Sequence, residues 1–370
     1  ATYAGTGWYR KTFTVPGHEK ASRLWLRFGG VHPSAEVWLN DQFLGRNGLP
    51  FVPFGFEITN PVRRGEPNHL AVRVHEANRE YGFAYSWQGN WSGLYRGVEL
   101  VTTGAQCLNQ IWFHPDADRG VIGVNAQIDG IATKSPLALE IRVRQAGQSE
   151  ICAQINHRVT GPTMHFDLPF PAPQRWSPDA PNLYEVDIRL LADGQPLDAQ
   201  TERIGFVKLS THGQAFLIND KPYYMRGTGD FLSCPETGCP DTNRDRWRRK
   251  LQALRDFGYN YVRCQSYVYG PEYYDAADEV GLLVQSEMGM LGAWGGHTNQ
   301  HVYQWPKPTP DHYPHLKRQW DAVVLRDANH PSALLYCMSN EYVRDTDFRR
   351  IAWQCYHETR ALKPAAFVIW

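Results

Sequence analysis

The feature that most constrains this fold is a change in hydrophobic periodicity near residue 209. Before it, short runs alternate between apolar and polar residues and are broken by Gly, Pro and Asn, as in Arg23–Phe28 and residues 137–143. This period of two is typical of strands with one buried face. Residues 1–103 therefore predict an antiparallel β-sandwich, and residues 104–208 predict a second, immunoglobulin-like sandwich.

After residue 209 helical patterns alternate with buried strands, which predicts a parallel sheet with crossover helices. Helices are expected over 245–257, with Phe257 on the apolar face, from Pro271 through 277, and over 348–363. Five strands are expected, at 223–226, 259–264, 282–285, 333–338 and 366–370. A closed (β/α)₈ barrel takes about 250 residues, more than 209–370 supplies. Either the sheet is open or the C-terminal part of this domain is missing.

Charge and hydropathy exclude two classes of partner. Lys plus Arg and Asp plus Glu both total 38, so no basic field exists to attract nucleic acid or anionic lipid. No apolar run approaches the ~20 residues of a membrane helix. Aromatic residues are abundant, with 13 Trp, 19 Tyr and 16 Phe, which fits either all-β cores or platforms for sugar rings. The chain begins without Met, a mild lean towards a periplasmic or secreted protein.

Several polar residues end the predicted parallel strands, where functional residues gather in α/β domains. Glu287 and Glu341 are two carboxylates on neighbouring strand ends, with Arg263 and Asn340 beside them. Paired carboxylates suit glycoside hydrolysis, in which one protonates the leaving oxygen and the other attacks or activates water. The alternative is structural: a strand-end Glu that caps a helix or pairs with Arg.

Other candidates carry weaker signals. Trp294, in a loop rich in His, is either a sugar platform or loop packing. The spacing of the loop histidines matches no metal motif, so we expect no metal site. Cys234 and Cys239 could form a loop disulfide or stay free thiols.

Taken in order, the motifs resemble glycoside hydrolase family 2, which includes β-galactosidases, β-glucuronidases and β-mannosidases. The resemblance spans nearly the whole chain. Its early pieces are GWYRKTF at 7–13, AEVWLN at 35–40 and SGLYRGV at 92–98; its later ones are FLINDKP at 216–222 and MRG at 225–227. The most specific piece is RDANHPS at 326–332 followed by SNE at 339–341.

This resemblance implies a jelly-roll sandwich, an immunoglobulin-like sandwich and a (β/α)₈ barrel, of which residues 209–370 would supply the N-terminal part. Glu341 takes the family's acid/base position, and Asn340 would bind the sugar 2-hydroxyl. The family's nucleophilic Glu ends the seventh strand, so we expect it outside these residues. Glu287 would then have a supporting role.

Two departures from the family pattern affect which sugar the protein is expected to bind. Arg263 and Tyr267 match the family pattern, but Ser266 replaces a sugar-contacting His. After the first strand the family's His is also missing, and Asp230 is the alternative polar contact. Magnesium ligands of large β-galactosidases are not matched, so no metal and no cofactor are expected.

The sequence therefore predicts a retaining exo-β-glycosidase, β-galactosidase-like, acting on a carbohydrate substrate, with these residues alone inactive. Homo-oligomerisation stays open. One rival is a non-catalytic carbohydrate-binding or scaffold protein with a degenerate barrel. A second rival is an inverting hydrolase that uses Glu287 with Glu341.

Overall fold

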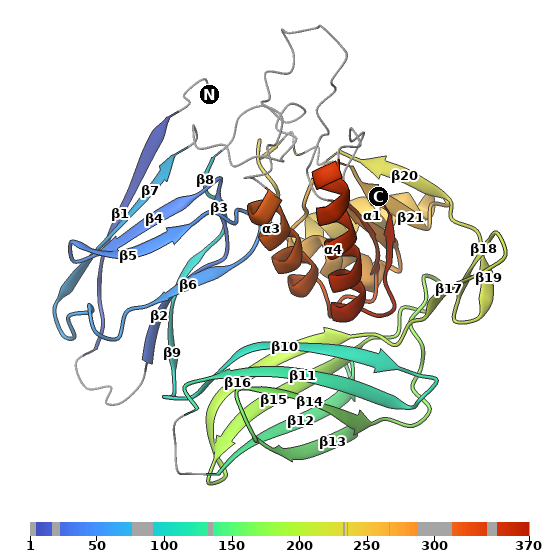
Figure 1. The fold of residues 1–370 in the computed structure, drawn as a ribbon, viewed down its shortest axis with the longest axis horizontal. Helices are drawn as coiled ribbons and strands as arrows, with labels where there is room; N and C mark the ends of the chain where they lie inside the picture. The colour runs from blue at the N-terminus through green and yellow to red at the C-terminus, as the bar shows by residue number, and fades with distance from the viewer. Residues whose placement is uncertain are drawn as a thin grey trace, which may run out of the picture.

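The computed structural model describes residues 5–16, 23–75, 92–131, 136–231, 234, 236–265, 267–287, 313–338 and 346–369. Three parts follow one another along the chain in Figure 1: a blue group of strands, a green group of strands, and yellow-to-red strands with helices. Each has its own hydrophobic core.

The first part is built from antiparallel strands, as predicted. One sheet has the order β1 (Thr6–Thr14), β7 (Pro67–His75), β4 (Ala35–Leu39) and β5 (Gln42–Asn47). A second has the order β6 (Phe54–Glu57), β2 (Arg23–Phe28) and β9 (Val98–Thr103), and β3 (Val31–His32) pairs with β8 (Gly93–Leu94). Alternate residues of β2 and β4 are buried, so one face of each strand faces the core.

The second part consists of two sheets of three and four strands. The first has the order β10 (Cys107–Asp116), β11 (Val121–Asp129) and β14 (Thr163–Pro169). The second has the order β13 (Ile151–Arg158), β12 (Leu137–Gln145), β15 (Tyr184–Ala192) and β16 (Gln195–Ile204). Seven strands in two packed sheets are typical of an immunoglobulin-like sandwich.

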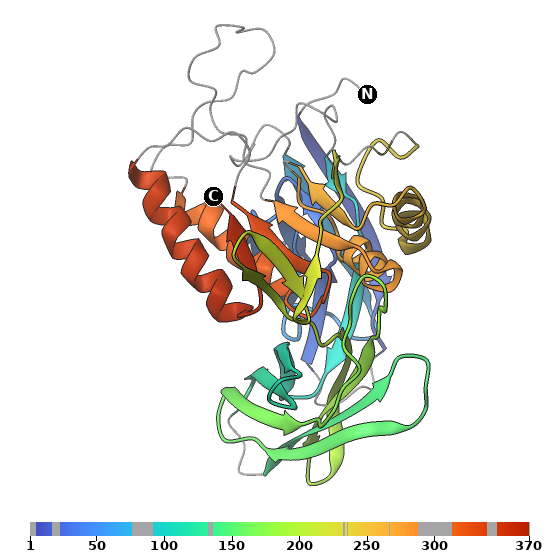
Figure 2. The same ribbon diagram turned by 90° about the vertical axis from the view of Figure 1, so that its right-hand side faces the viewer.

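A short antiparallel sheet leads into the third part: β17 (Leu209–His212), β18 (Ala215–Ile218) and β19 (Lys221–Tyr223). A five-stranded parallel sheet then follows chain order: β20 (Gly227–Asp230), β21 (Tyr261–Cys264), β22 (Leu283–Glu287), β23 (Ala333–Cys337) and β24 (Phe367–Ile369). The described helices are α1 (Arg244–Asp256), α2 (Pro271–Val280), α3 (Tyr313–Arg326) and α4 (Thr346–Leu362). Figure 2 shows α3 and α4 side by side on one side of this sheet.

Local signals explain the helix ends. The side chain of Asn243 accepts a hydrogen bond from Arg246 N and caps α1. Pro271 occupies the first turn of α2, and Gly281 ends that helix in the left-handed conformation with φ 76°. None of the described helices is both long and apolar enough to cross a membrane.

Two expectations were wrong in detail. The first parallel strand is β20 (Gly227–Asp230), whereas residues 223–226 were expected to form it. Its sequence, Gly-Thr-Gly-Asp, has no apolar run, so periodicity could not find it. Phe257 was expected in the core but is 83% exposed, because α1 ends at Asp256 and Phe257 is its C-cap residue.

Candidate functional site

Of the polar residues expected at strand ends, Asp230, Arg263 and Glu287 lie along the carboxyl edge of the parallel sheet. Its strands run in the order β20, β21, β22, β23, and their register places Asp230 opposite Cys264 and Glu287 opposite Cys337. In parallel α/β domains this edge is where substrate-binding loops begin. We call Asp230, Arg263 and Glu287 the strand-end set.

Arg263 and Glu287 form an ion pair across neighbouring strands. Arg263 Nε donates to Glu287 Oε2 at 2.7 Å, and the Glu287 side chain is 0% exposed whereas that of Arg263 is 33% exposed. Burial of Arg263 disfavours its charge, but the Glu287 carboxylate outweighs this and raises the pKa of Arg263. Glu287 is thus a positioning residue that holds the partly exposed Arg263 side chain in place. The structural alternative for Glu287, pairing with Arg, is what the geometry shows.

Asp230 is held in a similar way. Its side chain is 5% exposed; Lys250 Nζ of α1 donates to Oδ1 at 2.8 Å, and the Tyr273 hydroxyl of α2 donates to Oδ2 at 3.2 Å. These contacts fix α1 and α2 against the first strand. The geometry favours a positioning role for Asp230 over direct contact with a sugar.

Tyr267 lies where the first sandwich meets the parallel sheet. It is 4% exposed, and its ring packs edge-on against Phe51 at 5.7 Å and near Tyr269 at 6.5 Å. Phe51 and Val52, from the first sandwich, belong to the same hydrophobic cluster as the helices and strands of the third part. Tyr267 therefore also anchors the two parts to each other.

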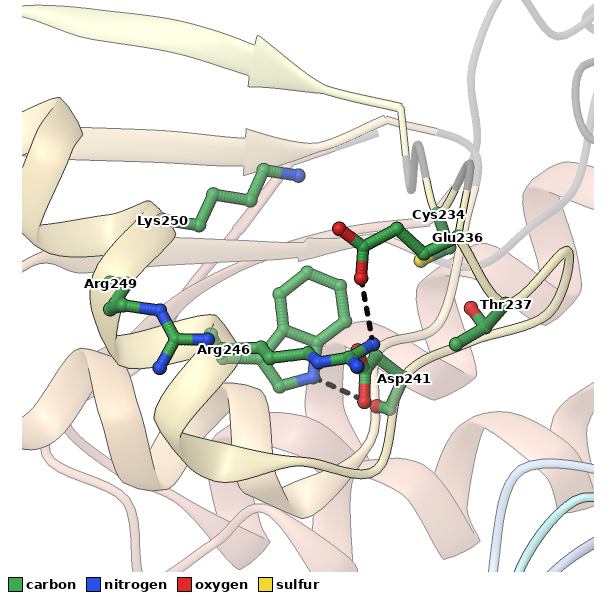
Figure 3. A pocket seen from close by; sticks show the side chains of 8 residues that line it. Cys234, Glu236, Thr237, Asp241, Arg246, Arg249 and Lys250 are labelled. Carbon is green, nitrogen blue, oxygen red and sulfur yellow. Dashed lines mark hydrogen bonds and ion pairs between the residues drawn. The ribbon is translucent and has the colours of Figure 1, made fainter.

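A pocket of about 250 Å³ opens beside the strand-end set, between α1 and residues that follow β20 (Figure 3). Arg246 reaches the Glu236 carboxylate at 3.1 Å and that of Asp241 at 3.0 Å. Lys250 also lines this pocket, so its bond to Asp230 links the pocket to the strand end. No signal in the sequence had pointed to it.

Cys234 lines the same pocket, and the possible Cys234–Cys239 disulfide is not formed in the structure. Both cysteines are free thiols. Burial raises the pKa of each thiol, which keeps them protonated and weakly nucleophilic at neutral pH.

The RDANHPS motif occupies a different place. Arg326 and Asp327 form a two-pronged ion pair, with Nε to Oδ1 and Nη2 to Oδ2 both at 2.7 Å. Arg326 also donates to the carbonyl of Phe51 in the first sandwich at 2.5 Å and to that of Tyr269 at 2.6 Å. Its guanidinium therefore joins the first sandwich to the α/β part.

The next residues of the motif join the second sandwich. Asn329 Oδ1 accepts from Phe113 N at 2.9 Å, and Asn329 Nδ2 donates to Glu202 Oε2 at 3.0 Å. Burial raises the pKa of Glu202.

The motif also binds α2. His330 Nδ1 lies 2.6 Å from Asp278 Oδ2, and Ser332 N donates to Asp278 Oδ1 at 2.9 Å. Burial disfavours the His330 charge, yet the Asp278 carboxylate outweighs this and raises the pKa of His330. We call Asp278, Arg326, Asp327, Asn329 and His330 the joint set. The motif was singled out from the sequence, but its role in joining all three parts was not foreseen.

Three of the expected site residues, Trp294, Asn340 and Glu341, lie outside the described residues, as does Ser266. Within the part of the chain that the structure describes, no group of three or more His, Cys, Asp or Glu side chains could hold a metal ion.

Family models match nearly the whole chain. Residues 1–104 match the sugar binding domain of "Glycosyl hydrolases family 2", 108–206 match the model with that description alone, and 209–368 match its TIM barrel domain.

Individual relatives are distant. A β-galactosidase of Photobacterium profundum is 26% identical over 353 residues, which are 91% of this chain and 33% of that protein. The crystal structure of a glycosyl hydrolase family 2 member from Bacteroides cellulosilyticus superposes with a TM-score of 0.80 at 24% identity, over 99% of this chain and 50% of that one. A β-glucuronidase from Bacteroides uniformis superposes with a TM-score of 0.81 at 20% identity, over 99% and 46%. The chain thus spans a third to a half of the length of these proteins.

Proposed function

Since the chain belongs to glycosyl hydrolases family 2, we propose that it is part of a retaining exo-β-glycosidase. Its substrate would be a terminal β-linked sugar of an oligo- or polysaccharide, of the β-galactoside type. Relatives named β-galactosidase and β-glucuronidase support the β-glycosidase class.

One observation supports the proposed location of the active site. The Arg263–Glu287 ion pair lies at the carboxyl ends of β21 and β22, and Glu287 lies opposite Cys337, the last residue of β23. Glu341 follows Cys337 by four residues, so covalent geometry alone keeps the two Cα atoms within about 14 Å. We therefore propose that an acid/base at Glu341 would act at this edge of the sheet.

The proposed reaction needs two carboxyl groups. Glu341 would protonate the glycosidic oxygen as a second carboxylate attacks the anomeric carbon, and would then remove a proton from the water that releases the sugar. Asn340 would bind the 2-hydroxyl, with Arg263 at the glycone and Trp294 as a stacking surface. The resemblance assigns the second carboxylate to enzyme sequence beyond residue 370.

The geometry argues against an inverting enzyme that uses Glu287 as the partner of Glu341. A catalytic carboxylate must reach the substrate or its attacking water. The Glu287 side chain is 0% exposed and already accepts from Arg263 at 2.7 Å. Freeing it would leave a buried charge without its cation, which costs several kcal/mol.

The stereochemistry of the product tests the proposal. We expect the full-length enzyme to release the β-anomer first from an aryl β-glycoside, as seen by ¹H NMR during the first minutes of hydrolysis, with mutarotation following. Initial release of the α-anomer would overturn retention. Absence of hydrolysis across β-galactosides, β-glucuronides and β-mannosides, together with measurable sugar binding, would favour the non-catalytic alternative.

A further inference from the structure

The outer face of the first sandwich carries large aromatic side chains that face water. Trp8 of β1 is 49% exposed and Phe43 of β5 is 53% exposed, and Trp38 of β4 is half-buried between them. These strands belong to one sheet, drawn in blue at the left of Figure 1. Exposed aromatic residues grouped in this way mark interaction surfaces more often than scattered ones do.

The three rings form a continuous row across the sheet. The Trp8 and Trp38 ring centroids are 5.4 Å apart, and those of Trp38 and Phe43 are 5.2 Å apart. Trp38 and Phe43 are register partners on neighbouring strands. β7 lies between β1 and β4 and contributes Arg73 opposite Trp8 and the small Ala71 opposite Trp38. The row therefore crosses the sheet from β1 to β5.

Arginines lie among the rings. The Arg73 guanidinium is 5.8 Å from the ring centroids of both Trp8 and Trp38, and that of Arg10 is 5.9 Å from Trp8. Arg73 pairs with Glu36, the register partner of Arg46. Arg10 makes no ion pair with any residue that the structure describes. Arg73 shares its charge with Glu36, so Arg10 supplies the positive charge that no described acidic side chain offsets, although the chain as a whole has a net charge of zero.

Each part of this face matches a group of an acidic sugar chain. The flat side of a pyranose ring presents C–H groups that pack on an aromatic ring, and its edge carries hydroxyls that hydrogen-bond to charged side chains. A carboxylate or sulfate on the sugar matches the planar donors of an arginine.

We propose that this face, made by Trp8, Trp38, Phe43, Arg10 and Arg73, binds an acidic polysaccharide chain at a site separate from the strand-end set. The family model's description of residues 1–104 as a sugar binding domain assigns neither this face nor the acidic class. The proposal stands independently of the catalytic one, since none of its residues belongs to the proposed active site.

Binding of defined oligomers to the full-length protein tests the proposal. Isothermal titration calorimetry compares an oligogalacturonate of about six residues with a neutral β-1,4-galactan oligomer of the same length. We expect the uronate oligomer to bind and the neutral one to bind at least about 5-fold more weakly, with affinity falling as NaCl rises. Trp8→Ala should weaken uronate binding about 10-fold, and Arg10→Gln should remove most of the preference for the acidic oligomer.

Controls separate this face from general effects. Tyr224→Ala removes a different aromatic residue, 79% exposed, and Arg158→Gln removes an exposed arginine of the second sandwich; both should leave uronate binding unchanged. Arg10→Gln alters a solvent-exposed side chain and tests the proposal even if Trp8→Ala unfolds. Four results would overturn it: no uronate binding, equal binding of both oligomers, tighter binding of a single-stranded DNA oligomer, or a dimer in sedimentation that Trp8→Ala dissociates.

Discussion

The strand-end set and the joint set both bring charged side chains together in the same α/β part. The strand-end set lies at the carboxyl edge of the sheet, whereas the joint set connects the sheet to the other parts of the molecule. Glu287 at the carboxyl edge holds Arg263, whose side chain is 33% exposed. His330 and Asn329 precede β23, at the opposite edge, and tie the sheet to α2 and to the second sandwich. In barrels the first edge serves catalysis and the second serves stability. The motif most specific to the family thus lies mainly where the parts are joined.

The largest expected effect comes from breaking the strand-end ion pair. Arg263→Ala removes the guanidinium that donates to the buried Glu287 carboxylate at 2.7 Å, so we expect the free energy of unfolding to fall by about 3 kcal/mol or more. Urea unfolding followed by Trp fluorescence measures this.

The matched control is Arg119→Ala. Arg119 pairs with Asp167 at 2.7 Å, but the two side chains are 63% and 36% exposed, so its loss should cost about 0.5 kcal/mol or less. Equal stability of the two variants would show that the strand-end pair does not hold the edge together.

A smaller effect is expected at the joint set. Asn329→Ala leaves Phe113 N without its acceptor, which should cost about 1 to 3 kcal/mol. Because Asn329 links the second sandwich to the sheet, calorimetry should also show the thermal transition broadening or splitting.

Asn109→Ala provides the comparison, since Asn109 makes an exposed bond of 3.2 Å to Asp129 within the second sandwich. If the Asn329 variant melts in a transition as sharp as that of the Asn109 variant and at the same temperature, Asn329 does not couple the parts.

The smallest effect concerns pH. The pKa of His330 is raised above its unfolded value of about 6.5 because of Asp278. The His330–Asp278 contact should therefore contribute fully below pH ~6.5 and be lost as pH rises through the folded pKa. The free energy of unfolding of the wild type should therefore fall as pH rises above ~6.5. His330→Gln should make this fall smaller.

His165→Gln is the control for that measurement, since His165 bonds to Asn125 on an exposed surface. A fall in stability above pH ~6.5 that is as steep in the His330 variant as in the wild type would assign the titration to another group.

Most of the helices and strands could be predicted from the sequence. The alternation in 137–143 predicted a strand, and β12 buries Leu137, Leu139, Ile141 and Val143. α2 begins at Pro271 as expected and continues past 277 to Val280. Glu287 was predicted at a strand end, and β22 ends there. β20 was missed because Gly-Thr-Gly-Asp forms a strand only through its pairing with β21.

The hydrogen-bond and ion-pair partners of the polar residues could not be predicted from the sequence. Asn329 and Phe113 are separated by 216 positions, and no local pattern links them. The pairing of Glu287 with Arg263 was one of two alternatives that the sequence left open, and it required the register of β21 and β22. Lys250 on α1 reaches Asp230 only because the helix packs over the first strand. Local patterns predict elements, whereas these contacts depend on topology.

The most direct test of the proposed function is the leaving-group dependence of Glu341→Gln in the full-length enzyme. If Glu341 is the acid/base, turnover of an unactivated β-linked disaccharide should fall by about 10²- to 10⁴-fold. Turnover of a dinitrophenyl β-glycoside should fall much less, because that leaving group needs no proton. A variant that keeps wild-type turnover on the disaccharide would contradict the assignment.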